Sequence, residues 1–554
     1  MKRMTLGVLV LAACGSTPQP STTSEVAPTA PPPGDPAMTQ PTQPAATPSF
    51  PTQTATPQEL AFPEEAFRAN QPSAGEPRPY RFPKIKPFTL KNGIKVFLVE
   101  QHELPLVSID LNFEGGGIVD PKGKEGLASV CMAMLTEGTE KLDKLQYAEA
   151  LADIASNVGA YAAEDSQGVT LSSLTKHLDA TFQIFADTLR TPAFRASDFE
   201  RMIKRRIESV KQSKGDPASV AGRVGGAVLY GREHPHGTIT TEQSLAKITV
   251  DDCRKHVTTW LKPRGARLFV VGDLTEAQIR SYFDGAALAG WTGGAAKPKA
   301  LPAPKTLAGK IFFVHIPGAA QSRVSMLHFG PKRNAPDYFA TSMLGAAFGG
   351  SFSSRINMNL REDKGYSYGA RGGFGYTKQY GTFTAGASVR TDATYQTLLE
   401  LDREVKELAA SKRPIDKTEL DREKQGAILA LPGRFATAQA ALGQYRGLVY
   451  YGLPLGYYDS YITKVQQVSE AQVKAAATKQ LKPGQAVYLV VGDGDAKMIA
   501  RAPGDKDQPS GKDVPYTKDG KQLTLREALA DLAARGELGQ GALVELDVDG
   551  NPKG

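Results

Sequence analysis

The sequence predicts an α+β fold, because strand patterns, helical patterns and strand patterns follow one another along the chain. Residues 88–99 contain two β-rich runs around an Asn-Gly turn signal, which predicts two strands or a bent hairpin. Residues 106–113 form a further strand, helical patterns fill roughly residues 143–214, and residues 266–271 return to a strand. We therefore expect one complete α+β domain in this part of the chain.

An internal repeat predicts that this domain occurs twice. The string at residues 266–273 recurs in similar form at residues 486–493, an offset of 220 residues, and both copies end in Val-Val-Gly-Asp. Residues 293–310 lie between the copies and are rich in Gly, Ala, Pro and Lys, which is typical of a linker. A second series of strands and helices begins at Ile311. The sequence therefore predicts a duplicated fold.

The last part of the chain, residues 501–554, starts with a polar segment and then shows one amphipathic helix, about residues 523–535. We expect an appendage without chemistry there. The predicted organisation is a signal peptide at 1–14, a disordered tether at 15–80, an N-terminal domain at 81–292, a linker at 293–310, a C-terminal domain at 311–500 and the appendage at 501–554.

Composition excludes several classes of protein. The chain has 554 residues, of which 41% are hydrophobic and 22% charged, so it can bury a sizeable core. The net charge of +8 comes from dispersed Lys and Arg, so we do not predict nucleic-acid binding. The glycines at 115–117 lack the Gly-Lys-Ser/Thr ending of a phosphate loop, and Gly349-Gly350 precedes a serine-rich turn. Nucleotide binding is therefore unsupported.

The amino terminus predicts export. Lys2 and Arg3 precede a short apolar run that ends in Leu-Ala-Ala-Cys at Cys14, and this run is too short to span a bilayer. The pattern resembles the bacterial lipoprotein signal, in which the cysteine, here Cys14, becomes the lipidated first residue. An ordinary secretory signal with an incidental cysteine is the alternative.

Residues 15–80 hold 16 of the 38 prolines among Thr, Ser, Gln and Ala, which predicts a disordered tether. The lipoprotein resemblance implies a chain anchored in the cell envelope and facing the periplasm. Because Gly15 follows the cysteine in place of an inner-membrane retention aspartate, the resemblance favours the outer membrane.

In the first half, residues 123–139 resemble the helix that carries the metal site in the insulinase/pitrilysin family of metallopeptidases. In that family the helix bears His-x-x-Glu-His, because positions i, i+3 and i+4 share one face and direct two imidazoles and a general base at one zinc ion. Here those positions are Ser129, Met132 and Ala133.

The family's remaining zinc ligand is a glutamate on a later helix, which aligns with residues 199–209. The ligand position falls on Ser209, and Met202 occupies a supporting glutamate position. Glu208 is one residue off, and one residue on a helix rotates a side chain by about 100°. We therefore predict that this chain binds no metal and no other cofactor.

The histidines and cysteines do not predict a relocated metal site. The histidines are His102, His177, His234, His236, His256, His315 and His328. None forms His-x-x-x-His, and for His234-Pro-His236 we expect a turn in which both rings face solvent. We expect Cys131 and Cys253 to be buried small apolar groups, since three cysteines cannot form a disulfide framework.

In the second half, residues 348–369 closely resemble the carboxy-terminal domain signature of the same family. The family has an arginine and a tyrosine seven residues apart that reach towards the substrate backbone, and Arg361 and Tyr368 have this separation. A guanidinium and a phenol can donate to a peptide carbonyl and to the oxyanion that develops on it. The alternative is that Arg361 caps a helix and Tyr368 packs in a strand.

One further element of the resemblance concerns peptide binding. In the family an edge strand of the first domain pairs with the substrate, and its counterpart here is residues 157–163. We expect Gly159, Ala160 and Tyr161 to offer backbone groups to a peptide by β-augmentation, which tolerates many sequences. A purely structural strand is the alternative.

The resemblance covers roughly residues 85–500 and implies two α+β domains that face each other around a chamber. A family chain without the metal motif but with the Arg/Tyr pair commonly works with a separate chain that carries the metal motif. The sequence thus predicts a non-catalytic, peptide-binding subunit of a heteromeric zinc metallopeptidase, with zinc in the partner chain. Two alternatives are a partnerless peptide-binding or scaffolding lipoprotein and a peptidase with unconventional ligands.

Overall fold

The computed structural model describes residues 80–305, 308–504, 511–538 and 543–553. The predicted signal peptide, Cys14 and the predicted tether up to residue 79 lie outside the described residues. Within the described part of the chain, no helix combines the length and the hydropathy that crossing a bilayer requires.

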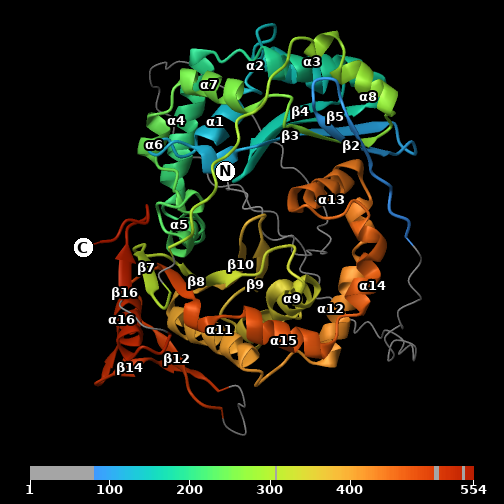
Figure 1. Cartoon of the computed structure of the whole chain (residues 1–554). Coiled ribbons are helices and arrows are strands. Elements are labelled where there is room, and N and C mark those ends of the chain that lie inside the picture. The colour runs from blue at the N-terminus through green and yellow to red at the C-terminus, as the bar shows by residue number, and fades with distance from the viewer. Residues whose placement is uncertain (1–79, 306–307, 505–510, 539–542, 554) are drawn as a thin grey trace, which may run out of the picture. The chain divides into compact units, whose positions relative to one another are not determined.

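The first half of the chain forms a six-stranded sheet in the order β1-β2-β6-β3-β5-β4. Figure 1 labels β2, β3, β4 and β5 of this sheet. β2 and β6 run parallel, and every other pair of neighbours is antiparallel. β1 and β2 form the hairpin that residues 88–99 predicted, with Gly93 at φ +90° in its turn. The strands are β1 (Lys86–Thr89), β2 (Lys95–Glu100), β3 (Leu106–Glu114), β4 (Asn157–Ala162), β5 (Ser166–Leu174) and β6 (Arg267–Gly272).

The second half forms another six-stranded sheet, in the order β16-β7-β11-β8-β10-β9. β11 and β16 run parallel to β7, and the other neighbours are antiparallel. The strands are β7 (Ile311–His315), β8 (Gln321–Gly330), β9 (Ala370–Tyr376), β10 (Gly381–Arg390), β11 (Val487–Gly492) and β16 (Leu543–Leu546).

The strand order confirms the duplication. β6 and β11 carry the repeated string, and they occupy equivalent places, since β6 lies between β2 and β3 and β11 lies between β7 and β8. The helices that precede them begin at capping boxes on Thr249 and Ser469, which are also 220 residues apart. The fold is therefore α+β with two homologous domains, as the sequence predicted.

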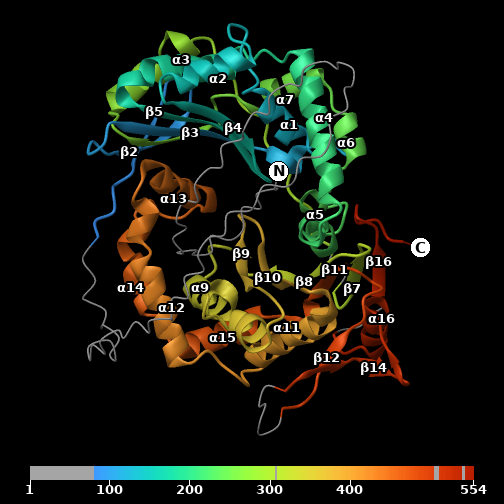
Figure 2. The same cartoon turned by 180° about the vertical axis from the view of Figure 1, so that it is seen from behind.

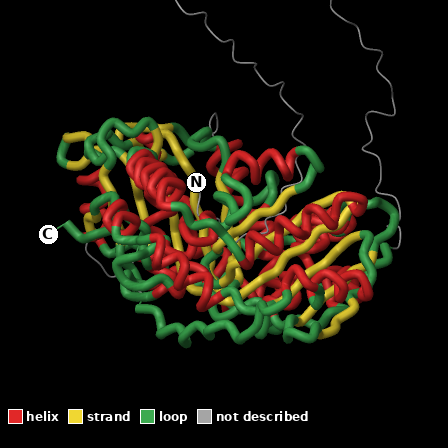
Figure 3. Tube along the Cα trace, turned by 90° about the horizontal axis from the view of Figure 1, so that it is seen from above, coloured by secondary structure: helices red, strands yellow, loops and turns green. Residues whose placement is uncertain are grey.

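Helices cover the sheets, as can be followed in Figure 3. In the first half they are α1 (Leu127–Met134), α2 (Lys144–Ala152), α3 (Leu178–Arg190), α4 (Ala196–Ser213), α5 (Pro217–Tyr230), α6 (Glu242–Ala246), α7 (Val250–Trp260) and α8 (Glu276–Phe283). In the second half they are α9 (Tyr338–Gly345), α10 (Arg355–Asn357), α11 (Thr394–Ala409), α12 (Lys417–Leu429), α13 (Ala438–Tyr451), α14 (Tyr461–Gln466), α15 (Glu470–Gln480) and α16 (Leu525–Arg535).

The two halves exchange one helix each. α13 of the second half packs against β3 and β6, where Phe269 and Val271 join the hydrophobic core of the second half. α5 of the first half packs against β8 and β11, where its Val220 and Val224 share a core with Val491 (Figure 2). Each sheet thus has one face covered by helices of its own half and another face contacted by a helix from the other half.

The C-terminal residues belong to the second domain rather than hanging from it. β16 pairs with β7 and completes the sheet at the edge where β1 lies in the first half. Leu525, Leu529 and Leu532 of α16 are fully buried in the core of the second half. Small strands connect this region to the domain, and they are β12 (Ile499–Arg501), β13 (Asp513–Pro515), β14 (Thr517–Lys518) and β15 (Lys521–Gln522).

Candidate functional site

The first-half positions that align with the family's metal motif lie on α1. The carboxylate of Asp120 caps this helix by accepting hydrogen bonds from the backbone N–H groups of Gly126 at 2.7 Å and Ala128 at 2.8 Å. Met132 is fully buried in the core of the first half, whereas Ser129 and Ala133 are half-buried. α1 packs against both α4 and β4, so the structure brings the three predicted elements of the first half together.

An arginine from α4 contacts the position of the first missing histidine. Arg206 donates from Nη1 to Ser129 Oγ at 3.0 Å and from Nη2 to the Ser129 carbonyl at 3.1 Å. Burial, together with the neighbouring Arg205, lowers the pKa of the Arg206 guanidinium, which nevertheless stays cationic. A fixed positive charge there opposes a metal cation by Coulomb repulsion. The residues at this position therefore do not fit a zinc ion.

Sequence reasoning missed Arg206, although a signal for it existed. Met202, Arg206 and Ser209 are spaced four and three residues apart, and such residues lie on one face of a helix. The predicted ligand position Ser209 is half-buried, while Glu208 is exposed and accepts from Lys211 at 2.8 Å.

The two described cysteines require a correction. Cys131 of α1 and Cys253 of α7 are both fully buried, as predicted, but they form a disulfide with a Cα–Cα distance of 4.7 Å. Three cysteines are too few for a framework of several disulfides, and a single bridge between residues 122 positions apart is compatible with that number of cysteines. Because α1 and α7 pack side by side, this single bridge fixes the helix that carries Ser129.

The close histidine pair also requires a correction. His234 and His236 do not face solvent, since both are buried, with 3% and 7% of their surface exposed. Their rings stack on each other at 5.3 Å and both lie against Tyr230, while His236 Nδ1 lies against the carboxylate of Glu164. His234 Nε2 also hydrogen-bonds the Pro302 carbonyl at 3.0 Å, so the contacts of both rings lie within the folded protein.

One other cluster brings possible metal ligands together at the ends of β7 and β11. His315, Asp493 and Asp495 place ligand atoms within 4.8 Å of one another. The backbone N–H of Gly494 donates to His315 Nδ1 at 2.8 Å, so the neutral ring carries its proton on Nε2. Neither ring nitrogen then has a free lone pair. The first half repeats this pairing in exposed form, with His102 Nδ1 2.7 Å from Asp273 Oδ1.

The predicted peptide strand is β4, which lies at the edge of the first sheet. Gly159, Ala160 and Tyr161 pair with β5 on one side only, so the edge position is as the sequence predicted. The Tyr161 phenol is not free, because it accepts from Asn112 at 2.9 Å and lies 3.1 Å from the carboxylate of Asp110. Burial raises the pKa of Tyr161. Peptide binding by these residues stays a prediction that concerns their backbone.

The second-half motif presents Arg361 and Tyr368 at the surface. Arg361 lies on the π-helix η7 (Met358–Asp363), with its guanidinium 4.7 Å from the centre of the half-exposed Phe352 ring. Its Nε also pairs with Glu362 at 3.1 Å. Tyr368 is 90% exposed. Arg361 therefore does not cap a helix through a buried contact, and Tyr368 does not pack in a strand.

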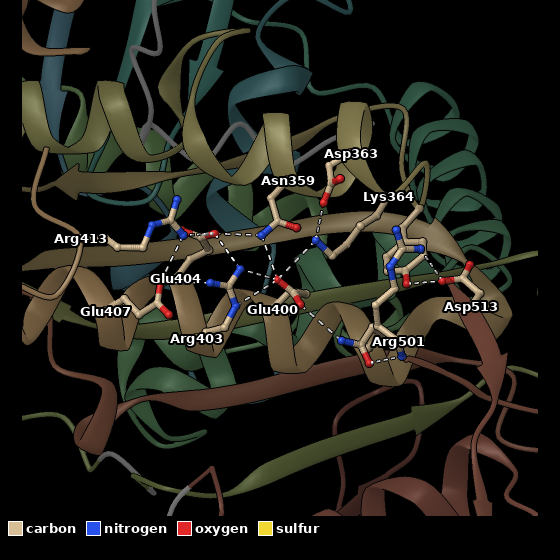
Figure 4. A network of polar contacts seen from close by, with 12 residues as sticks. Asn359, Asp363, Lys364, Glu400, Arg403, Glu404, Glu407, Arg413, Arg501 and Asp513 are labelled. Atoms are coloured by element: carbon tan, nitrogen blue, oxygen red, sulfur yellow. Dashed lines mark hydrogen bonds and ion pairs between the residues drawn. The ribbon is translucent and has the colours of Figure 1, made fainter. Parts of the chain in front are cut away.

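A polar network holds the segment that carries Arg361 (Figure 4). Asn359 of η7 donates from Nδ2 to Glu400 Oε2 and to Glu404 Oε1, each at 2.9 Å. Arg403 donates to both glutamates as well, at 2.7 Å and 3.0 Å. Burial raises the pKa of Glu400, but its bonds from Arg403 and Asn359 outweigh burial and lower it overall. This network anchors η7 to α11.

The residues before Tyr368 are anchored by the C-terminal region, which sequence reasoning considered to be without chemistry. The fully buried Tyr366 donates to Asp513 Oδ1 at 2.7 Å, and Arg501 donates to the same oxygen at 2.8 Å. Ser367 Oγ donates to the Ser388 carbonyl at 2.8 Å. The two residues before Tyr368 are fixed in this way, while the Tyr368 side chain itself is exposed.

Comparisons with known proteins agree with this geometry. The family model described as Insulinase (Peptidase family M16) matches residues 95–224, and the model described as Peptidase M16 inactive domain matches residues 247–427. The chain therefore belongs to the insulinase, or M16, peptidase family. Within it, the chain is a member without the His-x-x-Glu-His motif.

The individual relatives include proteins named as non-peptidases and proteins named as uncharacterized zinc proteases. The Non-peptidase homolog YmxG of Helicobacter pylori is 21% identical over 387 residues, which are 69% of this chain and 87% of that protein. The Uncharacterized zinc protease YmxG of Bacillus subtilis is 22% identical over 289 residues, covering 51% and 68%. A solved peptidase M16 inactive domain from Pseudomonas fluorescens matches with a TM-score of 0.67 at 26% identity, covering 74% of this chain and 98% of that one.

Proposed function

We propose that this protein is a non-catalytic, peptide-binding subunit of a heteromeric zinc metallopeptidase. Arg361 and Tyr368 contact the peptide backbone, and a separate family chain with His-x-x-Glu-His supplies the zinc. The observation that carries the proposal is a contrast within the chain. Arg206 contacts Ser129 at the aligned metal position, whereas Arg361 and Tyr368 are exposed on anchored segments.

The chemistry of the exposed pair supports the assignment. The Arg361 guanidinium is flanked by Phe352 and bound at Nε by Glu362, and no other residue in the described part of the chain binds its two terminal amino groups, so these can donate to a carbonyl oxygen. The Tyr368 phenol is open to solvent and can donate one hydrogen bond. Such donors stabilise negative charge on a peptide carbonyl, but they cannot activate water.

The proposal includes an envelope location. The Leu-Ala-Ala-Cys sequence at Cys14 resembles a lipoprotein signal, and we infer a lipid anchor, with the outer membrane favoured. The buried Cys131–Cys253 disulfide supports this location independently, since disulfides form and persist in oxidising compartments such as the periplasm.

The partner is tested by extracting the lipoprotein from its native membrane with mild detergent and identifying stoichiometric partners by mass spectrometry. A second family chain with His-x-x-Glu-His is the expected result. A lone chain that binds peptides would contradict the heteromeric proposal and favour the scaffolding alternative. Zinc in the purified single chain, with cleavage that a chelator stops, would favour a self-sufficient peptidase.

The assigned roles are tested in the purified complex with Arg361→Ala. Cleavage of a peptide substrate should fall at least tenfold while the two chains still co-elute, because the variant removes a donor at the carbonyl. The matched control is Arg254→Ala, which removes an exposed arginine of α7 that pairs with Asp251 at 2.9 Å. Unchanged turnover by Arg361→Ala would contradict the assignment.

A further inference from the structure

An arginine without a charged partner lies on the second sheet. Arg323 of β8 pairs across the sheet with Ser388 of β10 and Val491 of β11. Val491 belongs to the core that α5 covers, whereas the flanking Val324 belongs to the core on the opposite face. Because side chains alternate along a strand, Arg323 lies on the face of the sheet that α5 contacts.

The Arg323 guanidinium has unused hydrogen-bonding capacity. It is half-buried, and among the described residues it has neither an ion pair nor a hydrogen bond. Burial lowers the pKa of its guanidinium, and no carboxylate offsets this effect. Desolvating a cation without a partner costs free energy, so Arg323 does not stabilise the fold through charge.

The backbone beside this guanidinium is shaped by a glycine. A Cβ atom on Gly386 of β10 would lie 3.2 Å from Arg323 Nη2, 3.2 Å from Ser325 Oγ and 2.4 Å from the Val324 carbonyl. Only glycine allows this close approach. The Arg323 guanidinium therefore lies over the backbone of Gly386, where no side chain covers it, and the Ser325 hydroxyl lies over the same residue.

A second arginine lies on the same face. Arg371 of the edge strand β9 pairs with Gly386, which in turn pairs with Ser325, so the three residues form one row across the sheet. Arg371 is exposed, and its Nη1 donates to the Ala370 carbonyl at 3.1 Å. Like Arg323, it has no ion pair within the described ranges.

We propose that Arg323, with Arg371 and Ser325 beside Gly386, forms a site for a carboxylate group of a bound peptide. The inference rests on the proposed function, since it names the peptides that this chain prefers. A planar guanidinium fork matches a carboxylate with two parallel hydrogen bonds, and these charge-assisted bonds are the strong ones. The carboxylate belongs either to an acidic side chain or to the C-terminus of the peptide.

The test measures binding of the full-length protein to three labelled peptides by fluorescence anisotropy at fixed salt. All share one extended apolar sequence. The first has a free C-terminus, the second is amidated and contains one glutamate, and the third is amidated with glutamine in that place. At least one of the first two should bind tenfold or more tightly than the third, and the stronger one identifies the source of the carboxylate.

Variants assign the preference to the site. Arg323→Gln should abolish the difference among the peptides, and Arg323→Lys should retain only part of it, because an ammonium lacks the planar fork. Arg371→Gln changes an exposed side chain, so it reports on the site even if Arg323→Gln does not fold. Arg254→Gln is the matched control and should bind all three peptides like the unmodified protein.

The outcomes separate this inference from the proposed function. Equal binding of all three peptides, or an undiminished preference in both Arg323→Gln and Arg371→Gln, would overturn the carboxylate site and leave peptide binding intact. Binding of none of the peptides would overturn both. Arg323→Gln should not lower the melting temperature, because the cation has no partner to lose; a fall of several degrees would indicate a structural role instead.

Discussion

The two sheets differ at equivalent places on the face contacted by the helix from the other half. Asp110 of β3 pairs with Phe269, and Ser325 of β8 pairs with Leu489, which lies one repeat of 220 residues after Phe269. In the first half, Arg446 of α13 donates to Asp110 at 2.7 Å. In the second half, Arg323 lies on the same face as Ser325 and has no ion pair or side-chain hydrogen bond to any residue that the structure describes. After duplication, the charged residue on this face of the first sheet, Asp110, forms an ion pair, whereas the charged residue on the same face of the second sheet, Arg323, forms none with a described residue.

The difference shows how one fold can separate stability from binding. The Asp110 carboxylate is 1% exposed and holds Arg446, while Arg446 also donates to Tyr161 at 3.2 Å. Burial raises the pKa of Asp110, and the Arg446 guanidinium counteracts part of that rise. A charge that is fully used within the molecule contributes to structure, and a charge without a partner remains available to a ligand.

The largest expected effect comes from breaking the satisfied pair. Arg446→Ala should lower the free energy of unfolding by about 3–5 kcal/mol, because it leaves the Asp110 carboxylate buried without its cation. Urea unfolding followed by circular dichroism measures this change. The double variant Asp110→Leu with Arg446→Leu should recover much of the loss, since no charge is left buried. A cost below about 1 kcal/mol for Arg446→Ala would contradict the assigned role.

Acid should affect both halves in the same direction. His256 in the first half and His328 in the second are buried, and burial lowers the pKa of each ring to about 4. Each stays neutral in the folded protein while the unfolded chain takes up a proton near pH 6.5. Stability is therefore complete above pH 6.5 and falls towards pH 4, by about 3 kcal/mol for each histidine.

Urea unfolding at pH 7 and pH 4.5 measures this acid effect. His256→Gln or His328→Phe should reduce the loss between the two pH values, and His102→Gln, which changes an exposed histidine, should keep it. Equal stability of the unmodified protein at both pH values would refute the assignment of buried neutral rings.

The disulfide is a second difference between the halves, because the second half contains no cysteine. Replacing both Cys131 and Cys253 by Ala should lower the free energy of unfolding by about 2–4 kcal/mol, since the bridge restricts the unfolded chain. Reductant added during unfolding should destabilise the unmodified protein by a similar amount and leave the double variant unchanged. A reductant effect of equal size in both proteins would exclude the bridge as its source.

Much of the architecture could be predicted from local sequence. The repeated string places β6 and β11, and the capping residues Thr249 and Ser469 mark equivalent helices. These signals lie within a few residues of what they predict, so they can be read without knowledge of packing. The missing metal motif at Ser129, Met132 and Ala133 was equally visible, because it depends only on helical spacing.

The rest depended on contacts between distant segments. Arg206 contacts Ser129 across 77 residues, and Tyr366 contacts Asp513 across 147 residues. The packing of α5 on the second sheet and of α13 on the first sheet also brings together residues that no periodic pattern in the sequence connects. The buried His234 and His236 were assigned to solvent because a proline between them suggested an open turn, whereas packing around Tyr230 decided otherwise.

The smallest expected effect concerns the outer edges of the two sheets. β1 completes the first sheet by a local hairpin, whereas β16 completes the second sheet from the far end of the chain. After β16, Asp549 accepts from Lys214 at 2.7 Å and from Arg223 at 2.9 Å, which ties the C-terminal region to the residue that follows α4 and to α5.

Asp549→Asn should cost about 1 kcal/mol, because the pairs with Lys214 and Arg223 are partly exposed and screened by salt. Urea unfolding at low and high salt measures this cost, which should shrink at high salt. Asp251→Asn, which removes an exposed partner of Arg254, should cost less at either salt concentration. If Asp549→Asn lowers the free energy of unfolding by several kcal/mol at both salt concentrations, the edge strand β16 depends on this carboxylate. The hairpin edge of the first half has no equivalent dependence, since β1 and β2 are joined by a short turn.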